Sequence, residues 1–193
     1  MRILGLLIAI ICSWGACAKA PSPKPRPVVE TDAVAYFAGG CFWGVEHFMQ
    51  ELVGVGEVDS GYMGGTSEAP SYQEVSSGKS GHLETVRVSY DSKQISFRQL
   101  TKRFFEIHDP TQADGQGPDI GEQYRSAVFY ATPEERAAAQ ALIDTLVARD
   151  YNVVTELRKV SAFWPAEDYH QDYYAKSGKQ PYCHGLVRRF GTP

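Results

Sequence analysis

The stretch Gly39-Gly40-Cys41-Phe42-Trp43-Gly44 organises the rest of the chain. It follows an apolar run, residues 34–38, that predicts a buried strand, and it precedes apolar residues spaced along one face of a helix. Cys41 is therefore expected at a strand-to-helix turn, where the glycines let the backbone bend sharply. The free amides and the positive end of the helix dipole favour a reactive thiolate there. The alternative is a small buried apolar residue, as free cysteines commonly are.

The first thirty residues differ in composition from the rest of the 193-residue chain. Arg2 precedes an apolar run over residues 3–14, then small residues, and then a basic, proline-rich stretch. This pattern predicts a signal peptide at 1–20, a linker at 21–31 and one exported domain at 32–193, located in the periplasm or cell envelope. The apolar run is too short for a permanent membrane span.

Cys17 allows two ways of processing this leader. Ala16-Cys17-Ala18 is suitable as a small-residue cleavage site. Gly15-Ala16-Cys17 resembles a bacterial lipobox, although Trp14 stands where an aliphatic residue is usual. We expect contact with a membrane only if Cys17 is lipidated.

The charge balance argues against a nucleic-acid partner. Residues 1–29 hold four basic residues and no acidic one, which leaves 15 basic and 23 acidic residues, a net charge of −8, in the remainder. Phosphate binding requires clustered lysine and arginine. The sequence also lacks paired CxxC and HExxH patterns, so no metal site is expected, and it lacks the glycine-rich motifs of nucleotide-binding folds.

The remaining chain alternates predicted strands and helices. Strands are expected at residues 55–62, 83–90, 125–130 and 153–160, the last running on to Phe163-Trp164-Pro165. Capping boxes predict helices from Ser96 and from Thr132, and a short helix is expected from Glu167 to near Gly178. Long loops, one of which carries Tyr72, separate the strands. The predicted fold class is α/β, a two-layer sandwich with a mixed β-sheet.

Glu84 falls on the apolar side of its predicted strand, because it alternates in register with Val86, Val88 and Tyr90. Burial would raise the pKa of its carboxyl group and keep it protonated as a proton donor. The alternative is a glutamate at a strand end that reaches solvent or pairs with an arginine.

Only Cys41 and Cys183 remain outside the leader, at opposite ends of the domain. In an oxidising compartment, such a pair forms either a static staple or a redox couple.

Seven motifs, in order, closely resemble those of the peptide methionine sulfoxide reductase A family. They are Gly40-Cys41-Phe42-Trp43-Gly44, Gly61-Tyr62-Met63-Gly64-Gly65, Gly81-His82-Leu83-Glu84, His108-Asp109-Pro110, Gln116-Gly117-Pro118-Asp119, Gln123-Tyr124-Arg125-Ser126 and Ala166-Glu167-Asp168-Tyr169-His170-Gln171. The resemblance implies a ferredoxin-like core and reduction of the S epimer of methionine sulfoxide, free or in proteins.

The resemblance also implies site roles. Cys41 corresponds to the nucleophile, Glu84 to the acid that protonates the sulfoxide oxygen, and Tyr72 and Tyr124 to hydroxyl donors to that oxygen. Attack by Cys41 would leave methionine and a sulfenic acid.

Further residues complete the implied site. Asp119 is similar to an aspartate that holds water or orients substrate, and Phe42 and Trp43 to the walls of the S-methyl pocket. Cys183 would condense with the sulfenic acid to form a disulfide, which a thioredoxin-type or small-thiol reductant would open. The resemblance implies no bound cofactor, and we expect a monomer.

Two other functions compete with this one. A cysteine hydrolase or acyl transferase would use His82, His108 or His170 as the base beside Cys41. An exported peptide-binding module would use an aromatic groove, with Cys41 and Cys183 in a permanent disulfide.

Overall fold

Residues 29–191 are the part of the chain that this computed structural model describes, and they form a series of strands and helices. The predicted signal peptide and Cys17 lie outside the described residues. The elements in chain order are β1 (Ala33–Ala38), α1 (Phe42–Gln50), β2 (Val55–Met63), α2 (Tyr72–Ser76), β3 (Leu83–Tyr90), α3 (Phe97–Ile107), β4 (Gly115–Gln116), β5 (Asp119–Ile120), the 3-10 helix η1 (Glu122–Tyr124), β6 (Ala127–Tyr130), α4 (Pro133–Val147), β7 (Glu156–Lys159), β8 (Phe163–Pro165) and α5 (Tyr173–Ser177).

Six of the strands form one sheet in the order β7-β6-β1-β3-β2-β8. Neighbouring strands are antiparallel except β6 and β7, which are parallel. The predicted mixed sheet is therefore confirmed. Strands β4 and β5 pair separately as a small hairpin, inside a stretch that the sequence indicated only as a polar loop. Two-residue strands are too short for alternation to reveal them.

Alternation along the central strands determines which side chains face the main core. Phe37 of β1 is paired in register with Val86 of β3, and both belong to that core. Glu84 lies two residues before Val86, so it points to the same face of the sheet, and it is only 2% exposed. The prediction that Glu84 lies on the apolar side of its strand is confirmed.

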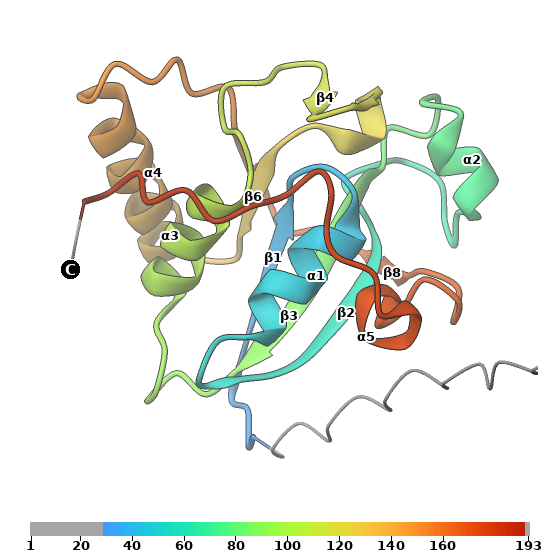
Figure 1. Cartoon of the computed structure of the whole chain (residues 1–193), viewed down its shortest axis with the longest axis horizontal. Helices are drawn as coiled ribbons and strands as arrows, with labels where there is room; N and C mark the ends of the chain where they lie inside the picture. Colours follow the sequence, from blue (N-terminus) through green and yellow to red (C-terminus); the bar gives the residue numbers. More distant parts are fainter. Residues whose placement is uncertain (1–28, 192–193) are drawn as a thin grey trace, which may run out of the picture.

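Three helices cover this face of the sheet (Figure 1): α1 packs on β2 and β3, α3 packs beside α1, and α4 packs against α3 and β6. The predicted capping box of α3 is confirmed, with Ser96 and Gln99 bonding reciprocally. At α4, Thr132 accepts the Glu135 amide, but the Glu135 carboxylate accepts the Ala131 amide instead of completing the box.

The single strand predicted from residue 153 to Pro165 is wrong. It forms two short strands at opposite edges of the sheet, β7 beside β6 and β8 beside β2. The helix predicted from Glu167 to near Gly178 ends where expected, at Ser177, but begins only at Tyr173, after a series of turns. Those turns are held by the Gln171 side chain, which bonds to the backbone of Ser60 and Ala166.

The tail after α5 passes the start of α1 and then crosses α3 toward α4 (Figure 1). Backbone bonds attach it to α3: the Gly185 amide donates to the Ile107 carbonyl at 3.2 Å and the Val187 amide to the Glu106 carbonyl at 2.7 Å. Cys183 is thereby brought to the turn that holds Cys41. Among the described residues, no helix has both the length and the apolar character needed to cross a membrane.

Candidate active site

Cys41 occupies the predicted turn between β1 and α1. It is the N-cap residue of α1 and is 7% exposed. Gly40 has a φ of 88°, and a Cβ at this position would overlap the Gln116 side chain. The turn therefore requires glycine immediately before the cysteine, both for its conformation and for the close approach of Gln116.

The Cys41 thiol is protonated in this arrangement, contrary to the expectation that the helix start would ionise it. A hydrogen bond with Cys183 raises the pKa of Cys41, and burial raises it further. The Trp43 amide acts in the opposite direction but does not compensate. The Phe42 amide donates to Glu84, so this part of the helix terminus stabilises a carboxyl group in place of the thiol.

Glu84 is a buried carboxyl group directed at the start of α1. Its Oε2 accepts the Phe42 amide at 3.1 Å. Burial raises the pKa of Glu84 well above its usual value, and the nearby Cys41 adds to the effect, whereas the Phe42 amide opposes it. Glu84 is therefore held protonated close to the thiol, as the strand pattern predicted.

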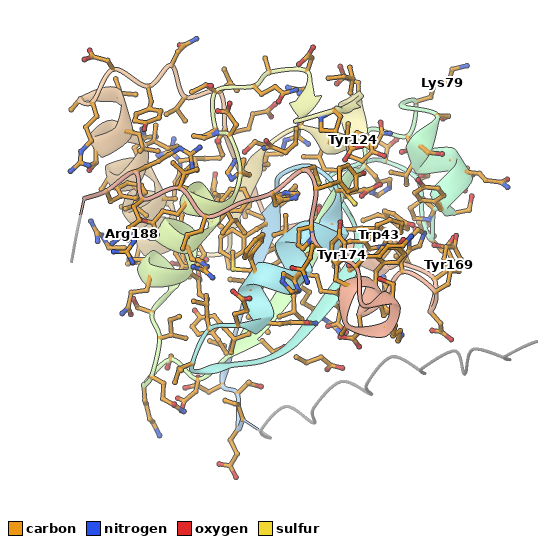
Figure 2. The ribbon with its side chains drawn as sticks, in the orientation of Figure 1. Trp43, Lys79, Tyr124, Tyr169, Tyr174 and Arg188 are labelled. Atoms are coloured by element: carbon orange, nitrogen blue, oxygen red, sulfur yellow. The ribbon has the colours of Figure 1, made fainter. Side chains whose placement is uncertain are left out.

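Two tyrosines face Glu84 from different elements. Tyr72 is the first residue of α2, where Ser71 forms a capping box, and not a loop residue as predicted. The hydroxyl groups of Tyr72 and Tyr124 are hydrogen-bonded to each other. Burial raises the pKa of both phenols, and Glu84 raises it further, so both remain donors. In Figure 2, Tyr124 and Trp43 lie on the same side of the molecule, near the start of α1.

Phe42 and Trp43 belong to an aromatic cluster beside these donors. Phe42 is buried, with its ring centroid 5.9 Å from that of Tyr62 and 5.0 Å from that of His170. Trp43 stacks on Tyr173 with centroids 3.7 Å apart, and its indole N–H donates to His170 Nδ1 at 3.2 Å. The rings are therefore fixed relative to each other and to the thiol.

Glu167 and His170 support this cluster. The Glu167 carboxylate accepts the Tyr62 hydroxyl at 2.9 Å and the Tyr72 amide at 3.0 Å, which fixes the start of α2. The His170 ring lies 4.8 Å from that of Tyr72. Burial lowers the pKa of His170, so the ring stays neutral and its Nδ1 remains available to Trp43.

Asp119 lies at the edge of the site in β5. Both of its carboxylate oxygens lie 3.0 Å from the Tyr182 hydroxyl, which donates to them. Burial and this carboxylate raise the pKa of Tyr182. The contact of Tyr182 is not predictable from the sequence, because a tyrosine in a polar tail has no pattern that connects it to an aspartate 63 residues earlier.

The comparisons with known proteins agree with this geometry. A family model described as "Peptide methionine sulfoxide reductase" matches residues 33–190, which include every side chain placed above. The chain belongs to the peptide methionine sulfoxide reductase family.

Relatives of known name extend the match. MsrA 2 of Synechocystis is 44% identical over 93% of this chain and 89% of its own length. The reduced form of Saccharomyces cerevisiae Mxr1 is 33% identical, with a TM-score of 0.75 over 81% of this chain and 92% of that chain. Mxr1 in complex with Trx2 has the same fold, with a TM-score of 0.54 and 23% identity over 87% of this chain and 96% of that chain.

Cys183 lies beside Cys41 in this member of the reductase family. Both cysteines are free thiols, and they are hydrogen-bonded to each other. A peptide-binding module with a permanent staple predicted a disulfide here. The structure instead has two free thiols close to each other.

None of the three histidines considered for a cysteine hydrolase contacts the thiol. His82 bonds to Gly65 and Ser67, His108 to Phe104 and Ser126, and His170 to Trp43. His184 was missed, and it is the histidine that contacts a sulfur, that of Cys183. The only sequence signal was its position next to Cys183. Within residues 29–191, no group of three or more histidine, cysteine or acidic side chains is arranged to hold a metal ion.

Proposed function

We propose that the protein reduces methionine-(S)-sulfoxide, free or within proteins, to methionine. Family membership assigns the chain to sulfoxide reduction. The observation that supports the mechanism most directly is the buried Glu84 carboxyl group at the start of α1, near the Cys41 thiol, where burial raises its pKa well above the usual value. A sulfoxide sulfur is a poor electrophile until its oxygen is protonated or hydrogen-bonded, so an acid close to the thiol supplies what this reaction needs.

The chemical step transfers one oxygen atom to Cys41. Glu84 donates its proton to the sulfoxide oxygen, to which Tyr72 and Tyr124 also donate hydrogen bonds. The sulfur–oxygen bond of the substrate breaks and a bond forms between this oxygen and Cys41, so the methionine sulfur is reduced and Cys41 becomes a sulfenic acid. The thiol proton of Cys41 replaces the proton that Glu84 has given.

Activation of Cys41 is coupled to binding of the substrate. Its hydrogen bond with Cys183 is the main cause of its raised pKa. A sulfoxide placed beside Cys41 displaces Cys183 and removes that cause, while the Trp43 amide continues to favour the thiolate. Binding of the substrate therefore lowers the pKa of Cys41, which favours loss of the thiol proton during attack.

Phe42 and Trp43 select the methyl group of the substrate. An aromatic wall accepts an apolar S-methyl group and leaves the sulfoxide oxygen to the hydroxyl and carboxyl donors. Asp119 holds the rim of this pocket through Tyr182 and orients substrate or water when the tail is displaced.

Recycling uses Cys183. Its sulfur attacks the Cys41 sulfenic acid, water leaves, and a disulfide forms that a thioredoxin-type reductant opens. Mxr1, which is 33% identical to this chain in its reduced form, has been solved in complex with Trx2, and this supports a reductant of that kind. A small thiol is the alternative reductant.

The proposal extends to the whole chain. The strand order β6-β1-β3-β2, with α1 and α3 as the helical connections, supports a ferredoxin-like core. The composition of residues 1–31 supports an exported domain over 32–193, in the periplasm or cell envelope, with lipidation of Cys17 as the alternative to a plain signal peptide.

Incubation with a methionine-(S)-sulfoxide peptide and dithiothreitol tests the proposal. The wild type should turn over repeatedly, and Cys41→Ser should release no methionine, because a hydroxyl group cannot take up the oxygen. The matched control is Cys183→Ser, which should remain active since dithiothreitol reduces the sulfenic acid directly. An inactive wild type, or an active Cys41→Ser variant, would show that the proposed function is wrong.

A further inference from the structure

His184 is buried between the tail and the turn that holds Cys41. It is 8% exposed. Its Nε2 lies 2.6 Å from the Gly39 carbonyl oxygen, and its Nδ1 lies 3.0 Å from the Cys183 sulfur. One imidazole therefore connects the backbone two residues before Cys41 to the second thiol of the site.

The Gly39 carbonyl determines the tautomer of this ring. A carbonyl oxygen only accepts hydrogen bonds, so His184 Nε2 must carry a proton and donate it. A neutral imidazole has one protonated nitrogen, which leaves Nδ1 with a free lone pair directed at Cys183. Burial lowers the pKa of His184 and keeps the ring neutral. His184 Nδ1 therefore accepts the thiol proton of Cys183.

The first turn of α1 is shaped to receive the ring. A Cβ on Gly44 would overlap His184 Nδ1, and a Cβ on Gly40 would lie 3.4 Å from its Cε1. The ring thus occupies the space that these two glycines leave open. Its position is fixed by packing as well as by its two hydrogen bonds.

We propose that His184 is the general base of the recycling step, which takes the proton of Cys183 as the Cys183 sulfur attacks Cys41 sulfenic acid. The proposal rests on the resolving role of Cys183 in the proposed function. A bond forms between the two sulfur atoms, the bond between Cys41 sulfur and its hydroxyl oxygen breaks, and the departing hydroxide takes up the proton held by His184. Cys183 is oxidised, the sulfenic sulfur is reduced, and one water is released.

The groups around the ring suit this role. Asp119 favours the imidazolium that forms during the step. His108, at the end of α3, has its pKa lowered by burial to about 3, so it stays neutral and does not repel that charge. Cys41, the site of the sulfenic acid in the proposed function, is hydrogen-bonded to Cys183.

The test uses the full domain, reacted with one equivalent of methionine-(S)-sulfoxide peptide without reductant. Methionine release and disulfide formation are measured separately after rapid acid quenching. His184→Gln keeps an N–H group for the Gly39 carbonyl but has no base. It should release methionine at the wild-type rate and form the disulfide more slowly, by about 10²-fold or more. His82→Gln, which replaces a buried histidine bonded to Gly65 and Ser67, is the matched control and should both release methionine and form the disulfide at the wild-type rates.

The pH profile separates a base from a structural role. In the wild type, disulfide formation should be independent of pH over the range in which His184 is neutral. In His184→Gln, it should rise about tenfold per pH unit, because hydroxide must then ionise the Cys183 thiol. A disulfide formed at the wild-type rate, or a slow rate with the wild-type pH profile, would overturn the proposal. Absence of the methionine burst in the wild type would instead refute the proposed function.

Discussion

Glu84 shows how a single residue acquires its chemistry from its position in a strand. Alternation in β3 directs it to the side of the sheet that the helices cover, and the Phe42 amide holds one of its oxygens. Burial then raises the pKa of the carboxyl group well above its usual value, which favours the protonated form that the proposed reaction needs. The acid is thus produced by placement, without a neighbouring catalytic base.

Replacing Glu84 separates hydrogen bonding from simple occupancy of the site. Glu84→Gln can accept the Phe42 amide through its oxygen and donate through its amide, whereas Glu84→Ala can do neither. We expect Glu84→Ala to lose about 10²–10³-fold in methionine release, and Glu84→Gln to lose much less. Single-turnover release of methionine is the measurement, and equal losses in the two variants would reject the donor role.

The pH profiles of the wild type and of Glu84→Gln test whether Glu84 is protonated. Only the protonated carboxyl group donates, so wild-type methionine release should fall as pH rises through the raised pKa of Glu84. Glu84→Gln has no proton to lose there, and its profile should lack that decline. An unchanged profile in Glu84→Gln would assign the decline to another group.

At this scale, sequence patterns predicted the positions of Cys41 and Glu84 but not the state of Cys41. The alternation of residues in β3 predicts the face of the sheet on which Glu84 lies, and the glycines before Cys41 predict the position of the turn. The expected thiolate was wrong because its pKa depends on Cys183, which reaches it from the far end of the chain. His184 and Tyr182 were missed for the same reason, since their partners are distant in sequence.

At the scale of elements, the site depends on the fit between α1 and the tail. Gly44 lies in the first turn of α1, and a methyl group there would overlap the His184 ring. Alanine ordinarily favours a helix over glycine by about 1 kcal/mol. Here the overlap opposes that gain, because His184 is buried and cannot move without displacing the tail.

Gly44→Ala should therefore displace His184 and Cys183 together. We expect turnover with dithiothreitol to be retained and turnover with thioredoxin to fall by about tenfold or more, as the tail no longer supplies its base and thiol. The control is Gly185→Ala, in the same tail, where a Cβ would meet nothing within 4 Å. An unchanged ratio of the two activities in Gly44→Ala would contradict this account of tail docking.

Most strands and helices were predicted correctly from the sequence, but the neighbour of each strand in the sheet could not be predicted. Apolar periodicity indicated β1, β2, β3 and α3, because each has a clear period and defined ends. It could not divide residues 153–165 into β7 and β8, since the division depends on which sheet edge each half joins. The sequence pattern of residues 153–165 is the same whether they form one strand or two.

At the scale of the whole molecule, the fold brings two ends of the chain to one reaction. The β1–α1 turn contributes Cys41, the centre of the sheet contributes Glu84, and the tail contributes Cys183 and His184. Attachment of the tail to α3 by backbone bonds makes this approach part of the fold. The fold therefore places within one domain the two thiols that the proposed oxidation and recycling steps require.

The most direct test of the central claim is the fate of the sulfoxide oxygen in the Cys183→Ser variant. The protein is reacted with one equivalent of methionine-(S)-sulfoxide peptide without thiol, and its cysteine peptides are examined by mass spectrometry after trapping of sulfenic acids. We predict one methionine per molecule and one sulfenic acid, located on Cys41. Methionine released with Cys41 unmodified, or a sulfenic acid on another residue, would contradict the account.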